Sequence, residues 1–345
     1  MSTFTSSLAN ADPGRPGVAL VSISRLQSLC ETVAPRYAGR ARFFSVREGY
    51  GAAVTALQAY VDAGSVDVVL AAGSNGAYLR ENLSVPVVTV KVNGFDVLSA
   101  ITRATTTWPG AQIGLVLHET ISHELADLDA WLKVSLKQRA YRSIDEVRLA
   151  VASLAAQGCG VIIGPGMACD FAQQAGLASV FLYSLGAVEE AFERSVELAR
   201  VSRQKESKRV RLNTIVAHLR DGVAAFDDAG QVEAVNPAML ELLGLDALPE
   251  ASLGGRDQDL PARVERAVGP LLRETLEHDQ PIEERIEQIG GRALIVNCVP
   301  IVEQGVRTGS VVTLQDALVA QRIDRSLRTS QRPKHLVARH RLDDL

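Results

Sequence analysis

Small polar and basic residues follow three of the short apolar runs in the first hundred residues of this chain. They comprise Ser22, Ser24, Arg25, Gly73, Ser74, Asn75, Lys91 and Asn93. Each loop leads into a helical pattern, and the free N–H groups at a helix start attract anions. Arg25 can make a two-pronged contact with a carboxylate, and Lys91 can supply a point charge. The loops therefore predict a binding site for a carboxylate.

A second set of loops follows the apolar runs of the next ninety residues. Its candidate residues are His118, Thr120, Gly164, Gly166, Tyr183 and Ser184. A spacing of 93 residues relates the two sets, so that Gly73 corresponds to Gly166 and Lys91 to Ser184. We therefore expect both sets to face one cleft.

Simpler explanations of these residues stay open. The segment from Gly73 to Asn75 is also an ordinary strand-to-helix turn, Arg25 a solvated side chain and His118 a loop histidine. Glu119 would repel a carboxylate, so we expect it in the first turn of a helix, where the dipole favours it.

Eight apolar runs separated by helical patterns must position these loops. They cover residues 18–23, 41–46, 66–71, 86–90, 112–117, 134–140, 160–164 and 179–183. Continuous runs of Val, Ile and Leu are typical of buried parallel strands. The pattern predicts an α/β fold with two doubly wound parallel-sheet halves around a cleft, where such sheets bind ligands beyond their strand ends.

Composition limits the class of protein. The 345 residues suffice for two or three domains, and 47% apolar with 22% charged residues excludes wholesale disorder. A net charge of −4 argues against a nucleic-acid coat, and four cysteines without CxxC spacing are expected to be reduced and buried. No apolar run is long enough to span a membrane, and residues 1–16 lack a signal-peptide core. We expect a cytoplasmic protein without membrane contact.

The second half of the chain has a different pattern. One long helix is predicted from residue 186 to 213, with six Lys/Arg residues at 200–211. Such a basic patch could bind nucleic acid, but without aromatic residues or a recognition-helix pattern it fits a solvated linker better. A small α+β domain follows, in which Asn236 and Pro237 start a helix. Its other predicted elements are strands at 222–227, 231–235, 281–289, 292–301 and 309–316 and a helix at 262–278.

Catalytic motifs are missing from the sequence. It has no GxSxG elbow, no GxGxxG loop and no HExxH, so we expect neither an enzyme nor a cofactor nor a metal. The alternative is a racemase- or isomerase-like enzyme acting on a carboxylic acid, which also pairs two α/β halves. Such enzymes use a Cys or carboxylate base in each half. Cys169 follows a strand end, but its counterpart at the 93-residue spacing is Gly76.

Several motifs resemble the N-terminal effector domain of the propionate-catabolism operon activators, a sigma-54-dependent family. They are Ser22-Ile-Ser-Arg-Leu26, Ala72-Gly-Ser-Asn-Gly-Ala-Tyr-Leu-Arg80, Lys91-Val-Asn-Gly-Phe-Asp96, Gly114-Leu-Val-Leu-His-Glu-Thr120 and Phe181-Leu-Tyr-Ser184. Residues 215–316 resemble a PAS domain. The resemblance implies 2-methylcitrate or a similar tricarboxylate as effector and a homo-oligomer. It also implies contact with sigma-54 RNA polymerase and DNA through an ATPase and a DNA-binding module, whose motifs are missing here.

The expected organisation has five parts. They are a disordered segment at 1–16, an effector domain at 17–199 with halves near 17–107 and 108–185, a helical linker at 200–213, a PAS domain at 214–317 and a linker toward an absent ATPase at 318–345. We expect the helix at 186–213 to pack on the second half and to relay ligand binding to the PAS domain.

Overall fold

The computed structural model describes residues 14–23, 25–119, 134–245, 260–278 and 280–322. The chain divides into two compact units, Met1–Ser207 and Lys208–Leu345. The termini at 1–13 and 323–345, which include most of the segments expected to be disordered or linking, lie outside the described residues.

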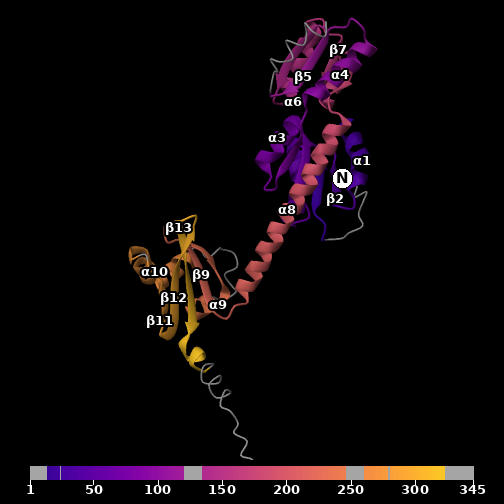
Figure 1. Ribbon diagram of the computed structural model, residues 1–345. Helices are drawn as coiled ribbons and strands as arrows, with labels where there is room; N and C mark the ends of the chain where they lie inside the picture. The colour runs from indigo at the N-terminus through magenta and orange to yellow at the C-terminus, as the bar shows by residue number, and fades with distance from the viewer. Residues whose placement is uncertain (1–13, 24, 120–133, 246–259, 279, 323–345) are drawn as a thin grey trace, which may run out of the picture. The chain divides into compact units, whose positions relative to one another are not determined.

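The first unit contains two parallel four-stranded sheets of the same topology (Figure 1). The first sheet has the order β2-β1-β3-β4 and the second the order β6-β5-β7-β8, with all neighbours parallel. This is the predicted pair of α/β halves. The strands are β1 (Gly17–Val21), β2 (Arg42–Val46), β3 (Val68–Ala72), β4 (Val87–Val90), β5 (Ile113–His118), β6 (Leu136–Tyr141), β7 (Val161–Gly164) and β8 (Ala178–Phe181).

Two helices cover one face of each sheet. On the first sheet these are α2 (Tyr50–Asp62) and α3 (Gly73–Asn82), which bury Leu57 and Leu79 against it. On the second they are α6 (Ile144–Ala156) and α7 (Gly166–Gln174), which bury Leu154 and Ala172.

The opposite faces are covered by exchanged helices. The helix α4 (Gly94–Thr107) follows the first sheet in the chain but packs on the second, through Val97 and Ile101. The helix α8 (Leu185–Ala217) follows the second sheet but packs on the first, together with α1 (Arg25–Tyr37). The expectation that α8 packs on the second half is therefore wrong. After β8 the chain crosses back to an apolar face of the first sheet that α1 alone leaves uncovered.

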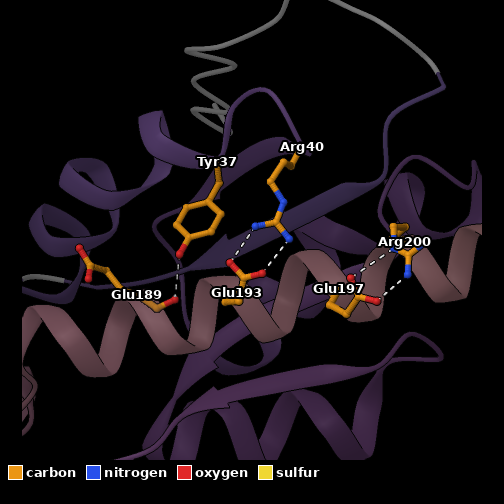
Figure 2. Close-up of polar contacts among 6 residues, drawn as sticks. All are labelled: Tyr37, Arg40, Glu189, Glu193, Glu197 and Arg200. Atoms are coloured by element: carbon orange, nitrogen blue, oxygen red, sulfur yellow. Dashed lines mark hydrogen bonds and ion pairs between the residues drawn. The ribbon is translucent and has the colours of Figure 1, made fainter.

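Polar contacts fix α8 along α1 (Figure 2). Two hydrogen bonds of 2.8 and 2.7 Å join the guanidinium of Arg40 to the carboxylate of Glu193. The Tyr37 hydroxyl donates to the Glu189 carbonyl at 3.4 Å, and Phe192 is fully buried between Tyr37 and Phe43. Within the first unit, α8 is therefore packed against the first half, although it follows the second half in the chain.

The second unit is a five-stranded antiparallel sheet in the order β10-β9-β13-β12-β11, in agreement with the predicted α+β layout. The buried amide of Asn236 caps the short helix α9 by accepting from the Met239 N–H at 2.9 Å, and it also donates to the Val216 and Asp221 carbonyls. The elements are β9 (Gly222–Asp227), β10 (Val232–Val235), α9 (Pro237–Leu242), α10 (Leu260–His278), β11 (Ile282–Ile289), β12 (Arg292–Glu303) and β13 (Val306–Asp316).

Three smaller expectations have outcomes in the structure. The four cysteines are free and buried, as predicted. The predicted linker at 200–213 continues α8 without a break. Within the described residues, no helix is both long and apolar enough to cross a bilayer.

Candidate functional site

A cavity of about 580 Å³ lies between the two halves of the first unit, at the carboxyl ends of their strands. This volume is in the usual range for a small-molecule site. The first half lines it with Gly73, Ala77, Arg80, Thr89, Val90, Lys91, Val92, Asn93, Gly94, Val97 and Leu98. The second half lines it with Val116, Leu117, His118, Glu119, Tyr141, Pro165, Leu182 and Tyr183.

Both chain crossings between the halves run along this cavity. The first crossing joins β4 to α4, and Asn93 caps α4 by accepting from the Asp96 N–H at 3.0 Å. The second joins β8 to α8, and Ser184 caps α8 by accepting from the Ala187 N–H at 3.0 Å. Residues of both connections between the halves therefore line the cavity.

The two caps correct the predicted correspondence between the halves. Ser184 follows Asn93 by 91 residues, whereas the first strands, Gly17–Val21 and Ile113–His118, start 96 residues apart. The spacing shrinks because fewer residues separate the starts of successive strands in the second half. Lys91 therefore corresponds to Leu182, not to Ser184, and the second half offers no cation at this position.

Positive charge enters the cavity from the first half. Lys91 is exposed at its wall, and the Arg80 guanidinium reaches in from α3, where it donates to the Thr89 hydroxyl at 3.4 Å. Glu119 faces them from the second half. It has a left-handed backbone (φ 61) directly after β5, rather than the helical first turn expected for it. Two cations against one carboxylate favour an anionic ligand.

His118 is the titratable group between these charges. Its ring is packed edge-on against Tyr141, and its Nδ1 lies 4.0 Å from the Glu119 carboxylate. Burial lowers the pKa of His118, and Glu119 partly opposes that shift. The imidazole is therefore neutral at pH 7 and can gain a proton when an anion binds.

Two buried tyrosines form the floor beside Gly73. A Cβ at Gly73 would lie 2.6 Å from the Tyr141 hydroxyl and 3.6 Å from that of Tyr183, and Gly73 itself has a φ of +52°. Neither hydroxyl has a hydrogen-bond partner among the described residues. Burial raises the pKa of both phenols, so they stay protonated and can donate to a carboxylate.

Two helix starts without side-chain caps flank this floor. The residues before α3 and α7, Ala72 and Pro165, make no side-chain cap hydrogen bond, and neither first turn contains an acid. A small cavity of about 50 Å³ lies between them and shares Tyr141 and Tyr183 with the large one. These N–H groups add to the positive potential of the site.

Family comparison agrees with this architecture. A model of the propionate catabolism activator matches residues 37–205, and a PAS domain model matches residues 210–277. Residues 37–205 belong to the propionate catabolism activator family. We call the first unit the activator domain from here on. The two matches give the chain a regulatory, sensing role.

Solved structures show similarity at low identity. An NtrC family transcriptional regulator from Clostridium acetobutylicum matches with 19% identity and a TM-score of 0.48, covering 55% of this chain and 98% of that one. The PAS domain of BvgS from Bordetella pertussis matches with 17% identity and a TM-score of 0.25, covering 37% of this chain and 98% of its own. The PAS domain of nitrogen regulation protein NR(II) from Vibrio parahaemolyticus has 18% identity and a TM-score of 0.22, covering 30% and 95%.

The activator domain brings only some of the predicted site residues together. Those lining the large cavity are Gly73, Lys91, Asn93, His118 and Tyr183. Those lining the small cavity are Ser74, Asn75 and Gly166. Those lining neither are Ser22, Arg25, Gly164 and Ser184. Ser24 and Thr120 lie outside the described residues.

Several of these residues have structural partners instead. The Asn75 side chain accepts from the Tyr50 N–H at 2.8 Å, and the Ser74 and Tyr50 hydroxyls are 2.7 Å apart. The Arg25 guanidinium donates to the Ser179 hydroxyl at 3.4 Å. The contacts of Ser74 and Asn75 agree with the simpler explanation of a strand-to-helix turn, whereas Arg25 is half-buried and bonded to β8 rather than solvated.

Sequence reasoning missed Arg80, Tyr141 and Thr89 of the activator domain. Arg80 lies two helical turns after Gly73, so it is on the same face of α3 although it is far from the loop. Tyr141 is the last residue of β6. The rule that ligands bind at strand ends, applied to every strand, would have included Tyr141.

The cysteine required by the enzymatic alternative is poorly suited to catalysis. Cys169 is fully buried in α7, where its thiol lies 3.6 Å from the Gly164 carbonyl. Burial raises the pKa of this thiol, which keeps it protonated and unreactive. Among the described residues, no group of three His, Cys, Asp or Glu side chains could hold a metal ion.

Proposed function

We propose that this chain is the ligand-sensing part of a sigma-54-dependent activator of propionate catabolism, and that the large cavity binds 2-methylcitrate or a similar tricarboxylate without turning it over. The observation that carries the proposal is the convergence of Lys91, Arg80 and two protonated tyrosine hydroxyls at the crossings between the halves. Carboxylates accept hydrogen bonds from all of these groups. In this proposal the protein acts in the cytoplasm as a homo-oligomer, and polymerase and DNA contact other modules.

Calorimetric titration tests the binding proposal. The whole chain is titrated with 2-methylcitrate, citrate and propionate, and we expect the tricarboxylates to bind and propionate to bind much more weakly. Lys91→Ala should weaken tricarboxylate binding by about 1.5–3 kcal/mol, the usual value of a hydrogen bond to a charged group.

Arg36→Ala is the matched control for Lys91→Ala. It also removes one positive charge, but from an exposed residue in the last turn of α1 that pairs with Glu189 and lines neither cavity. We expect its affinity to equal that of the unchanged protein. Equal affinity of Lys91→Ala and the parent would show that the site is misplaced.

We also propose that α8 relays this binding to the second unit. Its start follows the second crossing, it is fixed along the first sheet, and its last residues belong to the second unit. Ligand can shift this helix only if it binds one arrangement of the halves more tightly than another. Hydrogen exchange with and without 2-methylcitrate tests the relay. Protection limited to the cavity loops, with residues 200–217 unchanged, would remove the relay and leave the binding proposal standing.

A further inference from the structure

A second hollow lies outside the cavity, along the outer edge of the first sheet. This groove, of about 500 Å³, runs between β4 and α8. Its apolar lining consists of Val87, Val88, Leu198 and Val201. Its polar lining consists of Arg80, Thr89, Lys91, Arg194 and Glu197.

The backbone of β4 offers a free strand edge in this groove. The Val69 N–H donates to the Pro86 carbonyl at 3.0 Å, so Pro86 faces β3. Because alternate residues of a strand face opposite sides, Val88 and Val90 also face β3, and Val87 and Thr89 turn their N–H and C=O groups outward. Among the described residues, no strand pairs with this edge.

The charge of Arg194 in this groove is poorly compensated. Its counterpart in the other exchanged helix, 91 residues earlier, is Arg103, which donates to the Phe181 carbonyl at the end of β8 at 2.8 Å. Arg194 makes no equivalent contact: its buried Nε and Nη2 have no hydrogen-bond partner among the described residues, and its Nη1 lies 3.9 Å from Glu190. Buried donors without acceptors are rare and costly.

The one acid of the groove is already engaged. Both carboxylate oxygens of Glu197 accept from Arg200, at 2.6 and 3.2 Å (Figure 2). Arg80, Lys91 and Arg194 therefore give the groove a net positive charge above an apolar floor.

We propose that this groove binds an extended acidic segment of a partner protein, which adds to β4 as a further strand. The outward backbone groups of Val87 and Thr89 provide strand pairing, the valines and Leu198 accept alternate apolar side chains, and the three cations select acidic ones. A second copy of this chain fits worse, because pairing two β4 edges would bring the same cations of both copies together.

Fluorescence anisotropy with the whole chain tests the proposal. The probe is a labelled octapeptide of alternating Glu and Val, and the comparison peptide replaces Glu with Lys. We expect only the acidic peptide to bind, and Arg194→Gln to weaken it roughly tenfold or more. Arg36→Gln, which removes a charge that does not line the groove, should leave the affinity unchanged.

Two further arms separate strand pairing from simple charge attraction. Val87→Pro removes an outward N–H without touching the pairing to β3, and N-methylation of alternate peptide amides removes the matching donors even if that variant does not fold. Both should abolish binding. Equal binding of the two peptides, or full binding of the methylated peptide, overturns the proposal. So does a dimer of the chain that Val87→Pro dissociates, since a second copy would then occupy the edge.

Arg80, Thr89 and Lys91 line both the cavity and the groove, whereas Arg194 lines the groove and not the cavity. Substitution of Arg194 therefore tests the groove separately from the proposed effector site. Citrate binding by Arg194→Gln should equal that of the unchanged protein. Loss of peptide binding with intact citrate binding therefore concerns the groove alone.

Discussion

The two halves of the activator domain share one architecture but differ in the side chains at their strand ends. Both have the same strand order, the same pair of covering helices and an exchanged helix that starts at a capped crossing. At equivalent strand ends, however, the first half has Lys91 where the second has Leu182. The repeated fold thus creates a cavity at the strand ends, and the differences in side chains place its positive charge on the first half.

The largest expected effect tests whether the exchange makes the halves one folding unit. Phe192→Ala, in α8, should lower the free energy of unfolding by about 3–5 kcal/mol, and Ile101→Ala, at the equivalent position of α4, by about 2–5 kcal/mol, because both side chains are buried on the other half's sheet. Urea unfolding followed by circular dichroism should show both changes in the same transition.

Leu149→Ala serves as the control for these variants. This residue of α6 is 68% exposed, so its change should stay within about 0.5 kcal/mol. Separate transitions of the activator domain, one shifted by Phe192→Ala and the other by Ile101→Ala, would contradict a shared folding unit.

A smaller effect is expected at the glycine beside the tyrosine floor. Gly73→Ala should cost about 1–3 kcal/mol, because φ +52° is unfavourable for alanine and its Cβ would collide with the Tyr141 hydroxyl. It should also reduce citrate affinity. Gly94→Ala is the matched control, since nothing lies within 4 Å of an added Cβ there. Thermal unfolding measures the stability of both variants. Equal stability of the two would show that neither the backbone conformation of Gly73 nor its contact with Tyr141 excludes a side chain.

Arg103 in α4 and Arg194 in α8 are at equivalent positions and extend the comparison of the two halves. Arg103→Met should destabilise by about 1 kcal/mol, because the Phe181 carbonyl loses its donor. Arg194→Met should be neutral or stabilising, because it removes buried donors that lack acceptors. Urea unfolding of both variants gives the comparison. An equal loss would mean that Arg194 has a stabilising contact comparable to that of Arg103.

The smallest effect concerns pH. Burial holds the pKa of His118 below its usual 6.5, so the unfolded chain binds a proton more readily and stability falls as the pH drops below about 6.5. Citrate affinity should change in the opposite direction and rise at lower pH, since a charged imidazole attracts the anion. His118→Gln should weaken the pH dependence of both the free energy of unfolding and the free energy of citrate binding. Between pH 7.5 and 5.5 the difference from the unchanged protein should be less than about 1 kcal/mol. Unchanged slopes in unfolding and titration experiments would exclude His118 as their source.

Much of the fold was predictable because it depends on local patterns. Short Val/Ile/Leu runs gave the parallel strands, and Asn236 before Pro237 gave the start of a helix in the second unit. The exchange was not predictable, because the apolar stripe of α8 indicates that it is buried but not against which sheet. Arg80 was missed for a similar reason: a helix brings a residue two turns away to the same site, and a search of loops does not find it.

The exchange of α4 and α8 has a consequence for synthesis on the ribosome. The first sheet is complete in sequence once β4 has been made, but α8, which covers one of its faces, is made about a hundred residues later. Until then Val18, Leu20 and Phe43 can pack against α1 but lack the α8 side chains that complete their burial in the finished protein. The nascent first half therefore presents an apolar surface to chaperones, and a boundary drawn between the halves would leave both pieces prone to aggregation.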